Sequence, residues 1–203
     1  MDIDRLATTF TITLPGWVAD ELYDVPDTLG GREDRMRLVN RLAARNHVEG
    51  SGGPFAAIVV ESDTGTIVSV GVNVTLASGI SSAHAEVVAL GLAQARLGTW
   101  DLGGPGQPAH ELVVNWRPCV QCYGATLWSG VRTLVVAGSG PELEELTTFD
   151  EGPMRDDWAA QFEERGIAVI DGVLREEALD VYRAYQRRVG AGDVTVYNAR
   201  HTE

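Results

Sequence analysis

The feature of this sequence that most restricts its fold is a series of short apolar segments separated by helical segments. Five segments rich in valine, isoleucine and leucine predict buried strands, at 55–60, 66–71, 111–115, 132–137 and 167–170. The first two flank Ser62-Asp63-Thr64-Gly65, a turn signal that predicts a hairpin.

Helices are predicted around and between the later strands, at 33–46, 84–97, 119–129, 156–165 and 175–188. Ser81 and Ser82 are the predicted caps of the second helix. Strands that alternate with helices after an opening hairpin indicate an α/β protein with a mixed sheet covered by helices on both faces.

The length of 203 residues is near the upper limit of one ordinary domain. We expect an irregular N-terminal arm at 1–31, where prolines and glycines interrupt scattered aromatic residues, and one domain at 32–189. A polar tail follows at 190–203.

The composition excludes several classes of partner. Sixteen basic and 29 acidic residues give a net charge of −13, and residues 142–180 alone carry 13 acidic side chains against three arginines. Such a surface repels phosphate backbones, so nucleic acid is not an expected partner. Because no apolar run approaches the roughly 18 residues of a membrane span, and the N-terminus lacks signal-peptide features, we expect a cytoplasmic protein that does not bind membranes.

Two short motifs contain residue types that bind metal ions: His84-Ala85-Glu86 and Pro118-Cys119-Val120-Gln121-Cys122. A helix start favours the thiolate form of Cys119 and Cys122, and their spacing puts both sulfurs on one side. His84 can supply a third ligand for Zn²⁺ if the two helix starts converge. Three protein ligands leave one tetrahedral position for water, which is typical of catalytic zinc.

Glu86 is the candidate catalytic residue, because a carboxylate beside that water can move its proton to a departing amine. The pattern H-x-E with a downstream P-C-x-x-C matches the signature of zinc-dependent deaminases. Two alternatives stay open at this point: a thiol-disulfide oxidoreductase that uses Cys119 and Cys122, and a noncatalytic module stabilised by zinc.

Other suggestive residues have ordinary interpretations. His47, His110 and His201 lack partnered spacing and are expected in surface or packing roles, and Gly138-Ser139-Gly140 is expected to be a turn. Trp128 is expected in the core rather than stacked on a substrate.

Residues 52–151 resemble the cytidine and nucleobase deaminase superfamily, and are most similar to its guanine deaminase branch. Besides the two motifs, the resemblance rests on four features: Gly52-Gly53-Pro54-Phe55, Asn73 eleven residues before His84, Gly124-Ala125 with Trp128, and Phe149-Asp150-Glu151. It implies a cytidine deaminase-like fold, a three-layer α/β/α sandwich with about five strands. It also implies hydrolytic deamination of a free nucleobase by a zinc enzyme, with guanine as the first candidate.

The resemblance further implies that substrate contacts come from Phe55, Asn73, Ala85, Asp150, Glu151 and Tyr197. Members of the branch form homodimers that exchange C-terminal segments, so Tyr197 is expected to close over a site. The chain departs from the branch in having Arg117 in place of glutamate, in Glu151 in place of aspartate, and in the six residues that follow Tyr197. Cytosine, an amino-triazine or a nucleoside are the alternative substrates.

Overall fold

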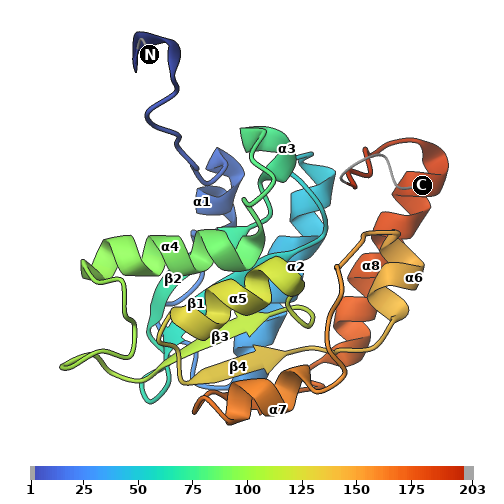
Figure 1. Cartoon of the computed structure of the whole chain (residues 1–203). Coiled ribbons are helices and arrows are strands. Elements are labelled where there is room, and N and C mark those ends of the chain that lie inside the picture. Colours follow the sequence, from blue (N-terminus) through green and yellow to red (C-terminus); the bar gives the residue numbers. More distant parts are fainter. Residues whose placement is uncertain (1–2, 199–203) are drawn as a thin grey trace.

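A single five-stranded sheet forms the centre of the protein, as the computed structural model shows for residues 3–198 (Figure 1). The strands lie in the order β2-β1-β3-β4-β5. Their bounds are Ala56–Glu61 (β1), Ile67–Val72 (β2), His110–Val114 (β3), Thr133–Val136 (β4) and Ala168–Ile170 (β5). Strand β1 is antiparallel to β2 and β3, whereas β3, β4 and β5 are parallel. The predicted mixed sheet and opening hairpin are confirmed.

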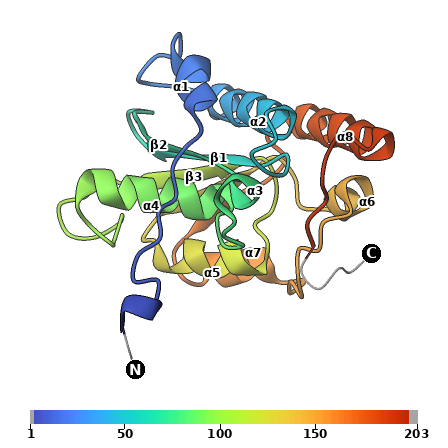
Figure 2. The same ribbon diagram turned by 90° about the horizontal axis from the view of Figure 1, so that it is seen from above.

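Helices cover both faces of the sheet, which gives the predicted three layers (Figure 2). One layer contains α1 (Gly16–Leu22), α2 (Arg32–Val48) and α8 (Arg175–Ala191). The opposite layer contains α4 (Ala85–Leu97), α5 (Val120–Trp128) and α7 (Trp158–Glu163). The remaining helical segments of the described chain are a 3-10 helix at Ile3–Arg5, α3 (Thr75–Ser78) and α6 (Glu142–Thr147). No helix of the described chain is long and apolar enough to cross a membrane.

Strand β1 shows how the sequence builds two cores. Alternate residues of a strand point to opposite faces of a sheet, so Ala56, Ile58 and Val60 pack into the cluster beneath α2 and α8. Ala57 and Val59 pack into the second cluster, beneath α4. All five are fully buried, and burying one valine or isoleucine stabilises a fold by roughly 1.5–3 kcal/mol.

A buried ion pair connects α2 to the sheet. Arg35 Nη1 lies 2.8 Å from Glu111 Oε2, and the half-exposed Arg32 lies 3.1 Å from Glu111 Oε1. Arg35 Nε also donates to the carbonyl of Leu29, 2.8 Å away. Because its charges are paired and hydrogen-bonded, the interaction fixes α2 against β3 without an isolated buried charge.

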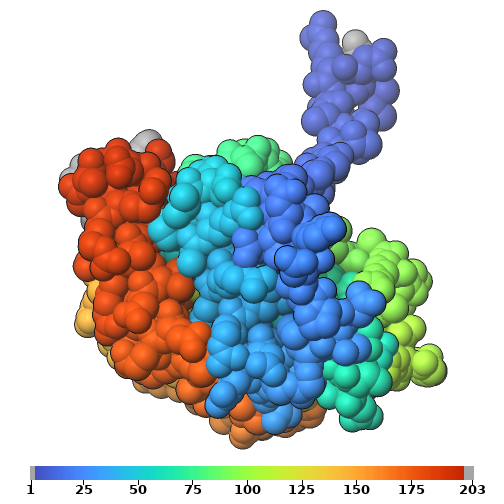
Figure 3. Space-filling view, turned by 180° about the vertical axis from the view of Figure 1, so that it is seen from behind, coloured from blue at the N-terminus to red at the C-terminus, as the bar shows by residue number. Residues whose placement is uncertain are grey.

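The ends of the chain differ in part from the expectation. The first residues extend from the body (Figure 3), but residues Gly16–Leu22 form α1 where an irregular segment was predicted, and its Trp17 and Val18 belong to the core. The acidic segment after β4, where no helix was predicted, contains α6. The division of the chain at 31 and 189 stays a proposal.

Candidate active site

The starts of α4 and α5 place three metal-binding side chains together. His84 and Cys119 are the residues immediately before the two helices, and Cys122 lies in the first turn of α5. His84 Nδ1 is 3.4 Å from Cys119 Sγ and 3.6 Å from Cys122 Sγ. The predicted serine caps are wrong, because the chain turns at Ser81 and Ser82 and begins the helix only after His84.

These distances fit a zinc ion. Tetrahedral zinc with Zn–S near 2.3 Å and Zn–N near 2.0 Å separates its nitrogen and sulfur ligands by about 3.6 Å. All three ligand atoms lie within 4.8 Å of one another. A redox pair has no need of an imidazole nitrogen close to both sulfurs, so the arrangement favours the metal site over the oxidoreductase alternative.

The two sulfurs differ in their affinity for protons. A hydrogen bond from Cys122 lowers the pKa of Cys119 to about 4, against the effect of burial and with help from His84. The same hydrogen bond and burial raise the pKa of Cys122 well above its usual value. One thiolate is therefore present at neutral pH before any metal binds, and thiolate is the form that ligates zinc.

Glu86 lies beside this cluster in the first turn of α4 and is 6% exposed. Burial and the charge of Cys119 raise its pKa to about 7, while His84 opposes the change. Burial lowers the pKa of His84, but Cys119, Glu86 and Glu151 outweigh it and raise that pKa to about 8. A carboxyl group with a pKa near 7 suits proton transfer at neutral pH.

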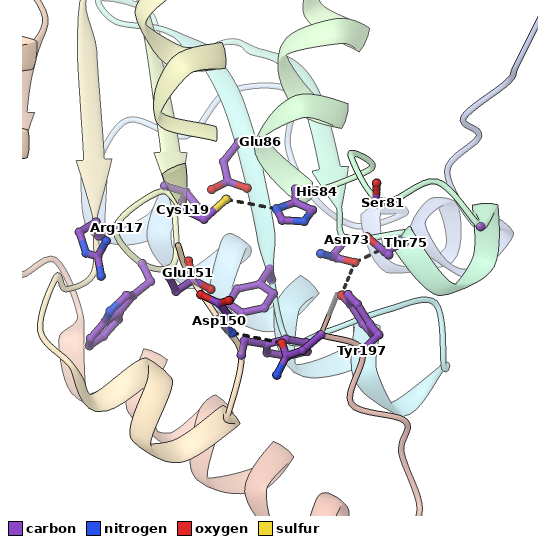
Figure 4. A pocket seen from close by; sticks show the side chains of 16 residues that line it. Asn73, Thr75, Ser81, His84, Glu86, Arg117, Cys119, Asp150, Glu151 and Tyr197 are labelled. Atoms are coloured by element: carbon purple, nitrogen blue, oxygen red, sulfur yellow. Dashed lines mark hydrogen bonds between the residues drawn. The ribbon is translucent and has the colours of Figure 1, made fainter. Parts of the chain in front are cut away.

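A cavity of about 470 Å³ opens next to these groups (Figure 4). Its size suits a small heterocycle. Its wall is formed by apolar rings, amides, hydroxyls and three carboxylates, contributed by Phe55, Asn73, Thr75, Gly79, Ser81, His84, Glu86, Val114, Trp116, Arg117, Cys119, Phe149, Asp150, Glu151, Tyr197 and Asn198.

Asn73 follows β2 and presents its amide to the cavity (Figure 4). Its Oδ1 accepts hydrogen bonds from the backbone N–H of Thr75 at 3.1 Å and from the Tyr197 hydroxyl at 2.7 Å. Because both bonds use the oxygen, the amide is oriented with Nδ2 available as a donor to a bound molecule.

Tyr197 closes over the cavity of its own chain. Its hydroxyl also accepts a hydrogen bond from the Gly53 N–H at 2.9 Å, and its ring packs against Phe149 with centroids 5.0 Å apart. Asn198 extends the contact by accepting from the Asp150 N–H at 3.1 Å and donating to the Thr148 carbonyl at 2.8 Å. The tail is thus held across the cavity by hydrogen bonds on two sides.

The two acidic residues after Phe149 differ in environment. Glu151 is buried, and burial with the charges of Cys119 and Glu86 raises its pKa to about 8, against the influence of His84 and Arg117. Asp150 is exposed, and its Oδ1 accepts from the Gly152 N–H at 2.9 Å. Glu151 is therefore the better placed of the two to contact a molecule inside the cavity.

Five of the six residues predicted to contact substrate line the cavity. Ala85 is the exception. It lies between His84 and Glu86 in the sequence, but its side chain belongs to the core cluster beneath α4 and does not line the cavity. Its role stays a prediction. The sequence did not indicate Thr75, Ser81, Phe149 or Asn198 as wall residues, although Phe149 belongs to a motif already noted.

The other notable residues lie elsewhere. His47 and His110 are buried in packing roles, as predicted, whereas His201 lies outside the described residues. The prediction for Trp128 is wrong, because its side chain is 81% exposed at the end of α5. Trp128 belongs to neither core cluster and does not line the cavity.

Comparisons with known proteins agree with this geometry. The sequence model of the cytidine and deoxycytidylate deaminase zinc-binding region matches residues 31–138. Guanine deaminase of Bacillus subtilis is 30% identical over 154 residues, which cover 76% of this chain and 93% of that protein.

Solved structures extend the likeness to most of the chain. The structure described as guanine deaminase from Nitrosomonas europaea is 41% identical, with a TM-score of 0.83 and coverage of 90% of this chain and 99% of that one. A structure of the protein NE0047 with 2,6-diaminopurine is 43% identical, with a TM-score of 0.82 and coverage of 94% and 97%.

Proposed function

Because the chain belongs to the family of zinc-dependent cytidine and deoxycytidylate deaminases, we propose that it converts guanine and water to xanthine and ammonia. One observation carries the proposal: Glu86 is buried between the three zinc-binding side chains and a cavity of a size for a free base. Two relatives that match this chain over 93% and 99% of their own length are described as guanine deaminases, which favours guanine over the other bases.

His84, Cys119 and Cys122 would hold the metal. When bound there, zinc supplies a water whose pKa is lowered to about 7. Glu86, buried beside these ligands and lining the cavity, would accept a proton from the attacking water and deliver it to the departing amine. General acid–base transfer of this kind contributes about 10²- to 10⁴-fold to a rate.

The cavity wall would hold the purine through complementary groups. Asn73 donates from Nδ2 to a ring acceptor, and the carboxyl group of Glu151 binds a ring N–H. Phe55 and Phe149, whose centroids are 5.5 Å apart, give the base an apolar contact surface. Tyr197 then covers the base and keeps out water.

Other parts of the assignment rest on the sequence. The homodimer and the cytoplasmic location stay predictions. The hydrogen bond from Tyr197 to Asn73 supports a cover formed by the chain's own tail, and exchange of that tail between subunits stays a prediction.

A panel assay of ammonia release tests the proposal. We expect zinc-loaded protein to act on guanine with a kcat/KM at least tenfold above that for cytosine, adenine, an amino-triazine or guanosine. A higher kcat/KM for any of these would replace guanine by that substrate. Activity on none of them would remove the proposed function.

A further inference from the structure

Arg117 is a buried cation in the cavity wall that lacks a full set of partners. It is the residue before Pro118, and its backbone N–H donates to the Gly138 carbonyl at 2.8 Å. Its side chain is 10% exposed, and its Nη1 is buried without a hydrogen-bond partner. The Nη2 atom is 3.9 Å from Glu144 Oε1, which is beyond hydrogen-bond distance.

Arg35 shows how this protein treats a buried arginine that serves the fold. Two of its nitrogens make hydrogen bonds of 2.8 Å, to Glu111 and to the Leu29 carbonyl. Burying a charge without partners is costly. Arg117 also lines the cavity, so a molecule bound there can supply an acceptor that the protein itself does not provide.

The surroundings of Arg117 restrict what can pair with it. A guanidinium group has only N–H donors and needs an acceptor. The cavity wall already contains the carboxylates of Glu86, Asp150 and Glu151, and Arg117 is the one lysine or arginine among its described residues. A phosphate would add negative charge beside these three acidic groups, whereas a neutral carbonyl oxygen adds none.

We propose that Arg117 donates a hydrogen bond to the exocyclic carbonyl oxygen of the substrate and selects oxo-amino heterocycles over diamino heterocycles. The inference rests on the proposed function and narrows its substrate class. Guanine carries such an oxygen, whereas 2,6-diaminopurine carries an amino group in the same place. An amino group meeting the donors of Arg117 would leave both unpaired.

The ratio of kcat/KM for guanine to that for 2,6-diaminopurine tests this role. Arg117→Met should lower kcat/KM for guanine by roughly 10- to 100-fold, the effect of one hydrogen bond to a charged group. It should raise kcat/KM for 2,6-diaminopurine or leave it unchanged, because the variant removes the donors that meet the amino group. Arg117→Lys keeps the charge and should retain an intermediate ratio. If the methionine variant does not fold, the lysine and glutamine variants give the same comparison.

A local control separates selectivity from general damage. Arg175 lies over the Trp116 ring, 4.9 Å from its centroid, and pairs with Glu142, but it does not line the cavity. Arg175→Met should therefore change both substrates to the same extent. Zinc content, measured for each variant, should stay at about one per chain.

Binding without turnover gives a second measurement. In a Glu86→Gln background, Arg117→Met should raise the Kd of guanine by roughly 10- to 100-fold and lower that of 2,6-diaminopurine or leave it unchanged.

If Arg117→Met lowered kcat/KM equally for the two bases, while the wild type still acted on guanine, the role of Arg117 would be overturned but the proposed function would stand. If Arg117→Met lowered kcat/KM for guanosine monophosphate but not for guanine, Arg117 would be assigned to binding a phosphate. That result would also overturn the proposed role of Arg117. A wild type inactive on guanine would remove the proposed function together with this inference.

Discussion

Replacing Tyr197 by phenylalanine removes one oxygen atom from the closed cavity. The hydroxyl donates to Asn73 Oδ1 at 2.7 Å and accepts from the Gly53 N–H at 2.9 Å. The ring contact with Phe149 is retained in the variant. The substitution therefore tests the two hydrogen bonds and leaves the packing of the tail in place.

The magnitude follows from those two bonds. A neutral hydrogen bond contributes a net 0.5–1.5 kcal/mol, so their loss weakens closure of the tail by about 1–3 kcal/mol, or roughly 5- to 150-fold. Asn73 keeps its bond from the Thr75 N–H at 3.1 Å, but its amide is held at one point instead of two. We expect kcat/KM for guanine to fall, mainly because KM rises, since substrate binding requires the oriented amide.

Tyr185→Phe is the matched control. The Tyr185 ring also packs against Phe149, with centroids 5.6 Å apart, but its buried hydroxyl has no hydrogen-bond partner. Steady-state kinetics should show kcat/KM within about twofold of the wild type for this variant. If Tyr197→Phe were equally silent, or if it lowered zinc content, the account of the tail as a cover held by its hydroxyl would be refuted.

Three further outcomes are expected. Arg35→Met should lower the free energy of unfolding, measured with urea, by about 3–5 kcal/mol because it leaves the Glu111 charge buried with a half-exposed partner; Arg35→Met with Glu111→Leu should recover most of that loss. Burial and the charge of Arg188 lower the pKa of His47 to about 4, so its contribution to stability is present above pH 6.5 and is lost as the pH falls from 6.5 to 4. Between pH 7.5 and 4.5 the wild type should lose about 1–3 kcal/mol more than His47→Gln, and equal losses would contradict the assignment. Removal of zinc by a chelator should abolish ammonia release and lower the Tm, and added zinc should restore both.

The central strands β1, β3 and β4 were predictable because their apolar runs are buried on both faces. Strands β3 and β4 lie within one or two residues of their predicted ends, and every residue of β3 is buried. Short helices gave weaker signals. Helix α1, about two turns between Pro15 and Pro26, has too few positions to show a helical period. In α6, the sequence Glu-Leu-Glu-Glu-Leu-Thr was not predicted to form a helix, although Leu143 and Thr147 are buried on one side of it.

The residues of the candidate site also differ in how well the sequence predicts them. The zinc-binding residues were predictable because each motif is local and stands at a helix start, so only the convergence of His84 with the two cysteines required the fold. The contact of Tyr197 with Asn73 joins residues 124 positions apart, and no periodicity or spacing reports such a contact. The resemblance alone indicated Tyr197, and it did not fix which subunit's cavity the tail covers.

Arg117 was visible in the sequence as a departure from the related proteins, but its environment was not. Only the coordinates show that its Nη1 is buried without a partner while Arg35, an equally buried arginine, is fully paired. Trp128 was misassigned for a related reason. Apolar character predicted burial, but the helix that carries Trp128 turns that position outward.

Zinc content and ammonia release from guanine, measured on the same preparations of wild type and Glu86→Gln, test the central claim most directly. We predict about one zinc per chain in both. The wild type should release one ammonia for each xanthine formed, and kcat of the variant should fall by about 10²- to 10⁴-fold. Full activity in metal-free protein, or an undiminished kcat in zinc-loaded Glu86→Gln, would contradict the account.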